Sequence, residues 1–264
     1  SSGGFYNNGL FNYWNAAVKR MTDGEVECER FNDKGTDGTI HNIKLVAKGS
    51  AKDGADMAFI QLGGLILDPH DNIEILGTIM WELGHLVSPK GSNVDEFSDL
   101  EDKGKTVGLN TRSGSAVTMQ VFIKEDKDYG KTVPTDFTKP FKAIKAMQAG
   151  KLDSYFFVSA PQTKDIKRMI DNKMIFRDFD DGDFYDFTYG PAKKKLYHKV
   201  KVGKKQGYPN SFVTVAVPAV VIVNKDWLAD NADFEEALFD AVGLTYNSVK
   251  GSNPQKFNYW PETK

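Results

Sequence analysis

The chain has 264 residues, of which 40% are hydrophobic and 27% are charged. This composition is typical of a globular protein and excludes a disordered chain. The net charge of −2 gives no overall attraction to nucleic acid or to an anionic membrane. The single cysteine, Cys28, excludes an internal disulfide and a multi-cysteine metal or iron–sulfur site.

Strand-like and helix-like runs alternate along the chain, and this alternation predicts α/β layers. In the first half we expect a helix over 11–21, a strand over 26–31, a helix over 39–48, and strands over 56–62, 73–80 and 85–88. A helix over 94–103, a strand over 105–109 and a helix from 117 follow. In the second half we expect a helix over 140–150, a strand over 152–158, a helix over 161–172, strands over 196–202 and 213–223, and a helix over 233–242.

The longest strongly apolar run, 213–223, contains Pro218 and is too short to span a bilayer. No positively charged, apolar leader precedes Ser1. We therefore expect either a cytosolic protein or a mature exported chain whose leader has been removed.

One arrangement occurs twice: a helix, a glycine, an acidic residue, an apolar strand and then small polar residues. The two passages are KGSAKDGADMAFIQLGG and MQAGKLDSYFFVSAPQT. Two similar α/β lobes would produce this pattern. In open α/β sheets ligands bind beyond the carboxyl ends of the strands, so facing strand ends would form a cleft.

Two serine- and glycine-rich segments precede predicted helices. SSGG at residues 1–4 offers free N–H groups and the positive end of a helix dipole to an anion, although a flexible chain end has the same composition. NTRSGSA at residues 110–116 makes the same offer, with Ser113, Gly114 and Ser115 as hydrogen-bonding groups and Arg112 as a clamp. Simple helix capping by serine is the alternative interpretation.

The sequence contains no catalytic or cofactor motif that we can identify. The four histidines show no HExxH spacing, Glu82 and His85 form a single ExxH, and the acidic stretch 178–183 lacks the glutamate of a calcium loop. Neighbouring carboxylates make Cys28 a poor nucleophile. G-x-S-x-G, the P-loop and GxGxxG are all missing. We therefore expect no metal, no cofactor and no catalysis.

The segment KKKLYHKVKVGKK (193–205) holds seven lysines. Its alternation and its glycine favour a solvent-facing hairpin, because lysine on an edge strand blocks aggregation. A nucleic-acid strip and a docking face for a partner protein are the alternatives. Among the aromatic residues, Tyr6, Trp81 and Tyr208 are the candidates for the wall of a ligand cleft.

The order of these motifs resembles the TAXI-type solute-binding proteins of tripartite ATP-independent periplasmic (TRAP) transporters. The matching passages are SSGGFYNNG, GADMAFIQ, GHLVSPKGSNVDEFSDLEDKGKTVGL, NTRSGSA, AIKAMQAGKLDSYFFVSAPQTKDIKRM and TVAVPAVVIVNKD, which together cover nearly the whole chain. The chain departs from the family in three places. The strand before Gly3 is missing, Asn7 and Asn8 replace Tyr-Pro, and Ser115-Ala116 replaces Thr-Arg.

The resemblance implies a type II periplasmic-binding-protein fold, in which two α/β lobes joined by a hinge close on a ligand in the cleft between them. Lobe one would comprise residues 1–85 and 225–264, and lobe two residues 86–224. The ligand-binding residues that we expect are Ser2, Gly3, Gly4, Tyr6, Gln61, Trp81, Arg112, Ser113, Gly114, Ser115 and Ser159.

The function implied is that of a monomeric extracytoplasmic receptor, without enzymatic activity, that captures a small anionic ligand and docks on membrane components of a transporter. The expected ligand is a small carboxylate, either an amino acid such as glutamate or a dicarboxylate. A phosphate- or phosphonate-binding protein, an enzyme and a sensor module of the same fold are the alternatives. Nucleic acid is not expected as a partner.

Overall fold

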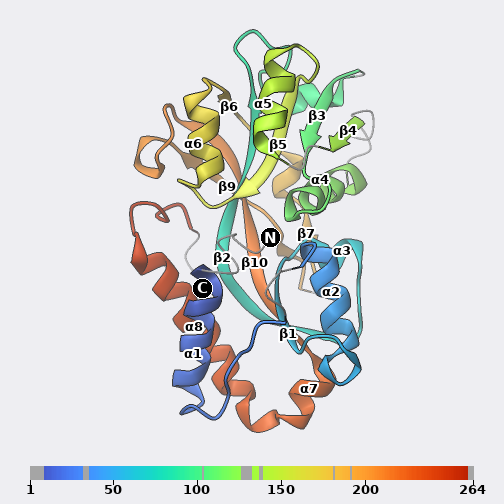
Figure 1. Cartoon of the computed structure of the whole chain (residues 1–264), viewed down its shortest axis with the longest axis vertical. Helices are drawn as coiled ribbons and strands as arrows, with labels where there is room; N and C mark the ends of the chain where they lie inside the picture. Colours follow the sequence, from blue (N-terminus) through green and yellow to red (C-terminus); the bar gives the residue numbers. More distant parts are fainter. Residues whose placement is uncertain are drawn as a thin grey trace. The chain divides into compact units, whose positions relative to one another are not determined.

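The computed structural model describes residues 9–31, 36–102, 104–125, 133–136, 139–180, 182–190 and 192–260. The chain divides into two compact units (Figure 1). Unit 1 comprises Ser1–Met80 and Pro218–Pro254, and unit 2 comprises Trp81–Val217 and Gln255–Lys264. The chain passes between the units along the long strands β2 (Ile73–Ser88) and β10 (Phe212–Asn224), and a third time at Pro254–Gln255. The lobe boundaries expected from the sequence stay a prediction.

Unit 1 places helices on a small sheet. Its strand β1 (Met57–Gln61) runs antiparallel to the end of β10, from Met57 opposite Val223 to Gln61 opposite Ala219. Helix α1 (Phe11–Met21) packs along α8 (Glu235–Ser252), and both helices bury an apolar stripe (Figure 1). The remaining helices are α2 (Thr39–Lys48), α3 (Gly64–Leu67) and α7 (Lys225–Asp230), with short 3₁₀ turns at Ser50–Lys52 and Ala232–Phe234.

Unit 2 contains both parallel and antiparallel strand pairs. Strand β3 (Thr106–Leu109) runs parallel to β4 (Val133–Asp136) and to β5 (Ser154–Ser159), and β5 runs antiparallel to the second half of β2. β6 (Ile175–Arg177) pairs with β2, and β9 (His198–Val202) pairs with the first half of β10. The other elements are α4 (Gly114–Glu125), α5 (Pro140–Gln148), α6 (Lys164–Asp171), β7 (Thr188–Tyr189), β8 (Lys194–Lys195) and 3₁₀ turns at Ser98–Glu101, Asp183–Tyr185 and Lys204–Gln206.

The core of unit 2 is a cluster of phenylalanine rings. Phe97, Phe122, Phe156, Phe179 and Phe184 are all fully buried. The ring centroids of Phe97 and Phe179 lie 4.3 Å apart, as do those of Phe122 and Phe184. These contacts fasten α4 and the segment after β6 to the sheet, and so hold the first turn of α4 at one edge of it.

The expected α/β architecture is confirmed, and so is the repeated passage. In unit 1, α2 leads through Gly49 and Asp56 to β1, and in unit 2, α5 leads through Gly150 and Asp153 to β5. The acidic residues have a structural role. The Asp56 carboxylate accepts a hydrogen bond from the Ser50 N–H (3.2 Å), and that of Asp153 accepts one from the Thr106 N–H (2.8 Å).

The expected strand over 26–31 is wrong. The alternation there is real, but the segment follows α1 and pairs with no strand. The N–H of Cys28 donates to the side-chain oxygen of Asn15 (2.9 Å), and Lys19 forms an ion pair with Glu27 (2.5 Å). Hydrogen bonds to the helix surface therefore replace those of a sheet.

The expected helix over 94–103 is also wrong, since only Ser98–Glu101 form a 3₁₀ turn. The carboxylate of Asp99 accepts from the N–H groups of Asp95 and Glu96, and Asp180 binds Ser98. Acidic side chains satisfy the backbone donors locally, which competes with a continuous helix. The two strands expected at 73–80 and 85–88 are one continuous strand, β2.

Candidate functional site

The turn between β3 and α4 is held by its own polar side chains. The N–H and the hydroxyl of Ser113 both donate to the Asn110 carbonyl (3.1 and 2.8 Å), and the Arg112 N–H donates to the Asn110 side-chain oxygen (3.1 Å). The side chain of Arg112 is exposed. The turn is thus built without the guanidinium group, which remains available to a ligand.

The first turn of α4 lies at the carboxyl end of β5. The hydroxyl of Ser115 accepts a hydrogen bond from the Val158 N–H (2.9 Å). Ser159, the last residue of β5, directly follows Val158. α4 has no acidic residue in its first turn to offset the positive end of its dipole. The fold therefore brings five of the residues expected at the site to one sheet edge that favours an anion: Arg112, Ser113, Gly114, Ser115 and Ser159.

The two serines that flank Gly114 differ in burial and in bonding. Ser115 is 6% exposed and its hydroxyl oxygen holds the backbone of β5. Ser113 is half-buried and its oxygen keeps the capacity to accept a further hydrogen bond after donating its proton to Asn110. Ser115 thus positions the strand end, and the groups that face outward come from Arg112 and Ser113.

Thr111 and Asp136 also lie at this edge, although neither was expected there from the sequence. The carboxylate of Asp136, at the end of β4, accepts from the Thr111 hydroxyl (2.9 Å) and from its N–H (3.3 Å). Because β4 runs parallel to β3, its last residue reaches the same edge as the Arg112 turn. An exposed carboxylate and an exposed guanidinium thus belong to one turn region, and only the pairing of β3 with β4 reveals it.

In unit 1, Gln61 ends β1 beside the start of α2. Its N–H donates to the hydroxyl of Thr39 (3.2 Å), the first residue of α2, and its side chain is 5% exposed. Gly64 allows α3 to approach α2, because a Cβ there would lie 2.4 Å from Thr39 Cγ2. The expected site residues Ser2, Gly3, Gly4 and Tyr6 lie outside the described residues.

Trp81 and Tyr208 pack inside unit 2. Trp81 is 8% exposed, contacts the His198 ring edge-to-face (4.8 Å between centroids), and accepts a hydrogen bond from the Tyr259 hydroxyl at its carbonyl (2.7 Å). Tyr208 is 2% exposed, and its hydroxyl lies 2.6 Å from Nε2 of the fully buried His85. Tyr208 is therefore a core residue rather than an exposed cleft wall, and burial lowers the pKa of His85 to about 3.

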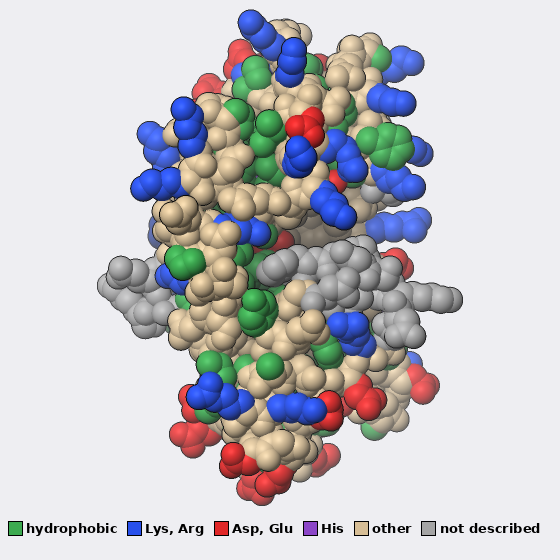
Figure 2. All heavy atoms as spheres, turned by 60° about the vertical axis from the view of Figure 1, so that its left-hand side comes forward, with side chains coloured by type: hydrophobic (Ala, Val, Ile, Leu, Met, Phe, Trp, Pro, Cys, Tyr) green, Lys and Arg blue, Asp and Glu red, His purple; other side chains and the backbone are tan. Residues whose placement is uncertain are grey.

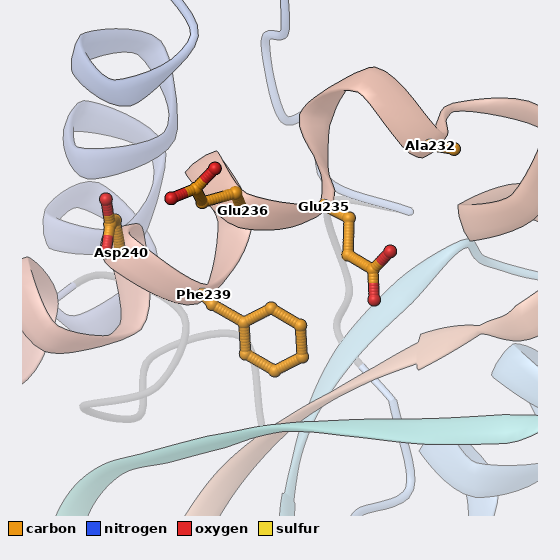
Figure 3. Close-up of a pocket in the computed structure, with 5 residues that line it drawn as sticks. All are labelled: Ala232, Glu235, Glu236, Phe239 and Asp240. Atoms are coloured by element: carbon orange, nitrogen blue, oxygen red, sulfur yellow. The ribbon is translucent and has the colours of Figure 1, made fainter.

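Two hollows in the surface do not involve the turn before α4. One, of about 370 Å³, is lined by Ala232 and the first turns of α8, where Glu235 and Phe239 point to the same side (Figure 3). The other, of about 480 Å³, lies after β9 in unit 2. Within the described ranges no group of three or more His, Cys, Asp or Glu could hold a metal ion. The helices described there include none long and apolar enough to cross a membrane.

Comparison with known proteins identifies both the family and the fold. Residues 6–233 match the NMT1-like family. The GluR0 ligand-binding core in complex with L-glutamate is a similar structure (TM-score 0.53, 14% identity, 96% of this chain and 91% of that chain). ArtJ of Geobacillus stearothermophilus, an arginine-, lysine- and histidine-binding protein, is another (TM-score 0.51, 13% identity, 97% and 87%).

A third similar structure is the ancestral amino acid-binding protein AncCDT-1, described as a precursor of cyclohexadienyl dehydratase (TM-score 0.51, 11% identity, 96% and 86%). At these identities the likeness concerns the fold alone. It confirms the expected type II periplasmic-binding-protein fold.

Proposed function

This chain belongs to the NMT1-like family, and on that premise we propose that it is an extracytoplasmic solute-binding receptor for a small carboxylate, an amino acid such as glutamate or a dicarboxylate. It delivers this ligand to a membrane transporter of the TRAP type and performs no chemistry of its own. The TRAP subtype is supported by the motif order described above.

The observation that carries the proposal is the sheet edge of unit 2. The N-terminus of α4 and the exposed Arg112 supply two kinds of donor to one small anion, and Ser113 holds the turn between them through its bonds to Asn110. A carboxylate matches this set, because the planar guanidinium binds its two oxygens in parallel. Gly114 adds backbone N–H access, with Ser115 and Ser159 beside it.

An amino acid is favoured by the carboxylate that stands beside these donors. Asp136 is exposed and is tied to Thr111, the residue before Arg112. A ligand with both a carboxylate and an ammonium group would satisfy Arg112 and Asp136 together. Similar structures of the same fold are reported with L-glutamate and as an arginine-, lysine- and histidine-binding protein.

We assign further ligand contacts to Gln61 and Trp81, and to Ser2, Gly3, Gly4 and Tyr6 in the stretch outside the described residues. The assignment of Gln61 and of the N-terminal residues rests on the motif order and on the position of Gln61 at the end of β1, and that of Trp81 rests on its aromatic ring as a candidate cleft wall. The protein is expected to act as a monomer, with the closed form docking on the transporter.

The direct test is a thermal-shift panel with glutamate, other amino acids, dicarboxylates, phosphate and phosphonates, because a bound ligand raises the melting temperature. Calorimetry with the best compound then measures Arg112→Ala. We expect binding at least about tenfold weaker, since a charge-assisted hydrogen bond is worth about 1.5–3 kcal/mol. Arg168→Ala, which removes an exposed arginine from α6, is the matched control and should bind normally.

If phosphate or phosphonates raised the melting temperature and carboxylates did not, the protein would be a phosphate- or phosphonate-binding protein and the carboxylate proposal would be wrong. Equal affinities of the Arg112→Ala and Arg168→Ala proteins would remove the turn before α4 from the site. Mass spectrometry of any small molecule that co-purifies with the protein gives an independent identification.

An enzyme of the same fold is the second candidate. One structure of this fold, at 11% identity, is described as an amino acid-binding precursor of a dehydratase. A receptor should return its ligand unchanged, so an NMR spectrum of the best ligand after prolonged incubation with the protein decides between the two. A new product that depends on the protein would favour the enzyme.

A further inference from the structure

Five lysines gather at the end of unit 2 that carries β8, β9 and the 3₁₀ turn after β9. We call this set the lysine face, and all of its members are exposed: Lys195, Lys199, Lys201, Lys204 and Lys205. Lys199 and Lys201 alternate with half-buried and buried residues along β9, so both point to the same side of the strand. The structure thus turns the lysine-rich segment of the sequence into one surface.

The lysine face surrounds a hollow rather than a flat strip. Lys201, Lys204 and Lys205 line the hollow of about 480 Å³, together with residues that include Ser211 and Asn258. At the other end of the face, Lys195 pairs with Asp186 (2.7 Å), and the Lys199 ammonium lies 5.4 Å from the centre of the Tyr185 ring. Positive charge and hydroxyl or amide groups together suit a phosphate-bearing headgroup.

The charges of the two units differ far more than the net charge of −2 suggests. Unit 1 has 9 Lys and Arg against 17 Asp and Glu, and unit 2 has 25 against 19. Figure 2 shows many Lys and Arg side chains spread over the surface of unit 2, and acidic side chains gathered at the far end of unit 1. The lysine face therefore belongs to the basic unit of the molecule.

The composition of the lysine face argues against nucleic acid and against a protein hot spot. Stacking on bases needs exposed aromatic rings, but Tyr197 and Tyr208 are 1% and 2% exposed, and the half-buried Tyr185 ring already has the Lys199 ammonium over it. Protein interfaces are anchored by Trp, Tyr and Arg, whereas the face contains lysine only. The large exposed hydrophobic side chains of the described residues, Tyr13, Phe31, Phe141 and Phe239, all lie outside it.

We propose that the lysine face is a docking surface for an anionic lipid bilayer. Lysine is a flexible, strongly hydrated point charge, which suits attraction to a mobile layer of headgroups better than recognition of one fixed shape. Clusters of four to eight basic residues act in this way at membrane surfaces. The hollow beside Lys201 accommodates a headgroup phosphate.

The test measures co-sedimentation of the full chain with vesicles of phosphatidylcholine, alone or mixed with phosphatidylglycerol. We expect binding to the mixed vesicles only, and weaker binding as salt is raised. The quadruple variant Lys199→Gln, Lys201→Gln, Lys204→Gln, Lys205→Gln should bind at least about a hundredfold more weakly, because each of the four lysines contributes about fivefold near the surface.

The matched control replaces four exposed lysines elsewhere in unit 2, Lys142, Lys145, Lys151 and Lys164, by glutamine, with the same change in charge. It should keep most of the binding. An equal loss in the two quadruple variants overturns the proposal, because net charge alone would then govern binding. Equal binding to neutral and anionic vesicles, or preference for a duplex oligonucleotide or polyglutamate over vesicles, overturns it as well.

Discussion

The buried histidine of unit 2 predicts a specific pH dependence of stability. His85 is 0% exposed, its ring stacks on Phe157 (4.6 Å between centroids), and Nε2 lies 2.6 Å from the Tyr208 hydroxyl. Burial lowers its pKa from 6.5 to about 3, because the charged imidazolium loses its hydration in this apolar site.

The sign follows from proton binding in the two states. Between pH 6.5 and 3 the unfolded chain binds a proton at His85 and the folded chain does not, so stability falls as the pH is lowered through this window. The slope is about 1.4 kcal/mol per pH unit, and the loss between pH 7 and 4.5 is roughly 2–3 kcal/mol.

The assay is urea unfolding of wild type and His85→Gln at pH 7, 5.5 and 4.5, followed by fluorescence and circular dichroism. Glutamine can still hydrogen-bond to Tyr208 but does not titrate, so the variant should be less stable at pH 7 and should lose less stability on acidification. The difference between the two proteins should shrink by roughly 2–3 kcal/mol at pH 4.5. His41→Gln, at an exposed position, controls for the loss of an imidazole. Parallel pH profiles for wild type and His85→Gln would refute the reasoning.

Two glycines should respond to alanine with opposite signs. Gly64→Ala places a Cβ 2.4 Å from Thr39 Cγ2 and should destabilise by about 1–3 kcal/mol. Gly243→Ala, in α8, adds a Cβ that meets nothing within 4 Å beyond its own stretch of helix, and should stabilise by about 0.5–1 kcal/mol. Urea unfolding checks both, and equal effects would contradict the packing argument. Asn224→Ala removes the cap of α7 and the hydrogen bond to the Val46 carbonyl (2.8 Å), so we expect a loss of about 2 kcal/mol in the same assay, and a change below 0.5 kcal/mol would contradict it.

Helices with a clear apolar stripe were predicted closely because their spacing alone decides which face is buried. α1, α2 and α5 begin at the expected residues, and in α1 the stripe consists of Trp14, Ala17 and Val18. The strand predicted at 26–31 was wrong because local spacing does not decide whether a partner strand is present. Alternation favours a strand only if a partner strand is available, and the side chains of α1 bind this backbone instead.

The candidate site divides along the same line. Arg112 and its serine- and glycine-rich turn could be predicted, because a turn of this composition before a helix exposes backbone donors whatever the surroundings. Asp136 could not be predicted, because it lies 26 positions after Asn110 in the chain and only the parallel pairing of β3 with β4 brings the two residues together.

By itself the sequence determined the α/β alternation, the family resemblance through its motif order, and the poverty in catalytic motifs, because these are properties of local spacing and residue type. Only the tertiary structure decided that Ser115 holds the end of β5, that Tyr208 and His85 form a buried pair, and that Lys201, Lys204 and Lys205 line one hollow. Such facts depend on contacts between residues far apart in the chain, and the balance of burial and hydrogen bonding that selects those contacts involves the whole fold.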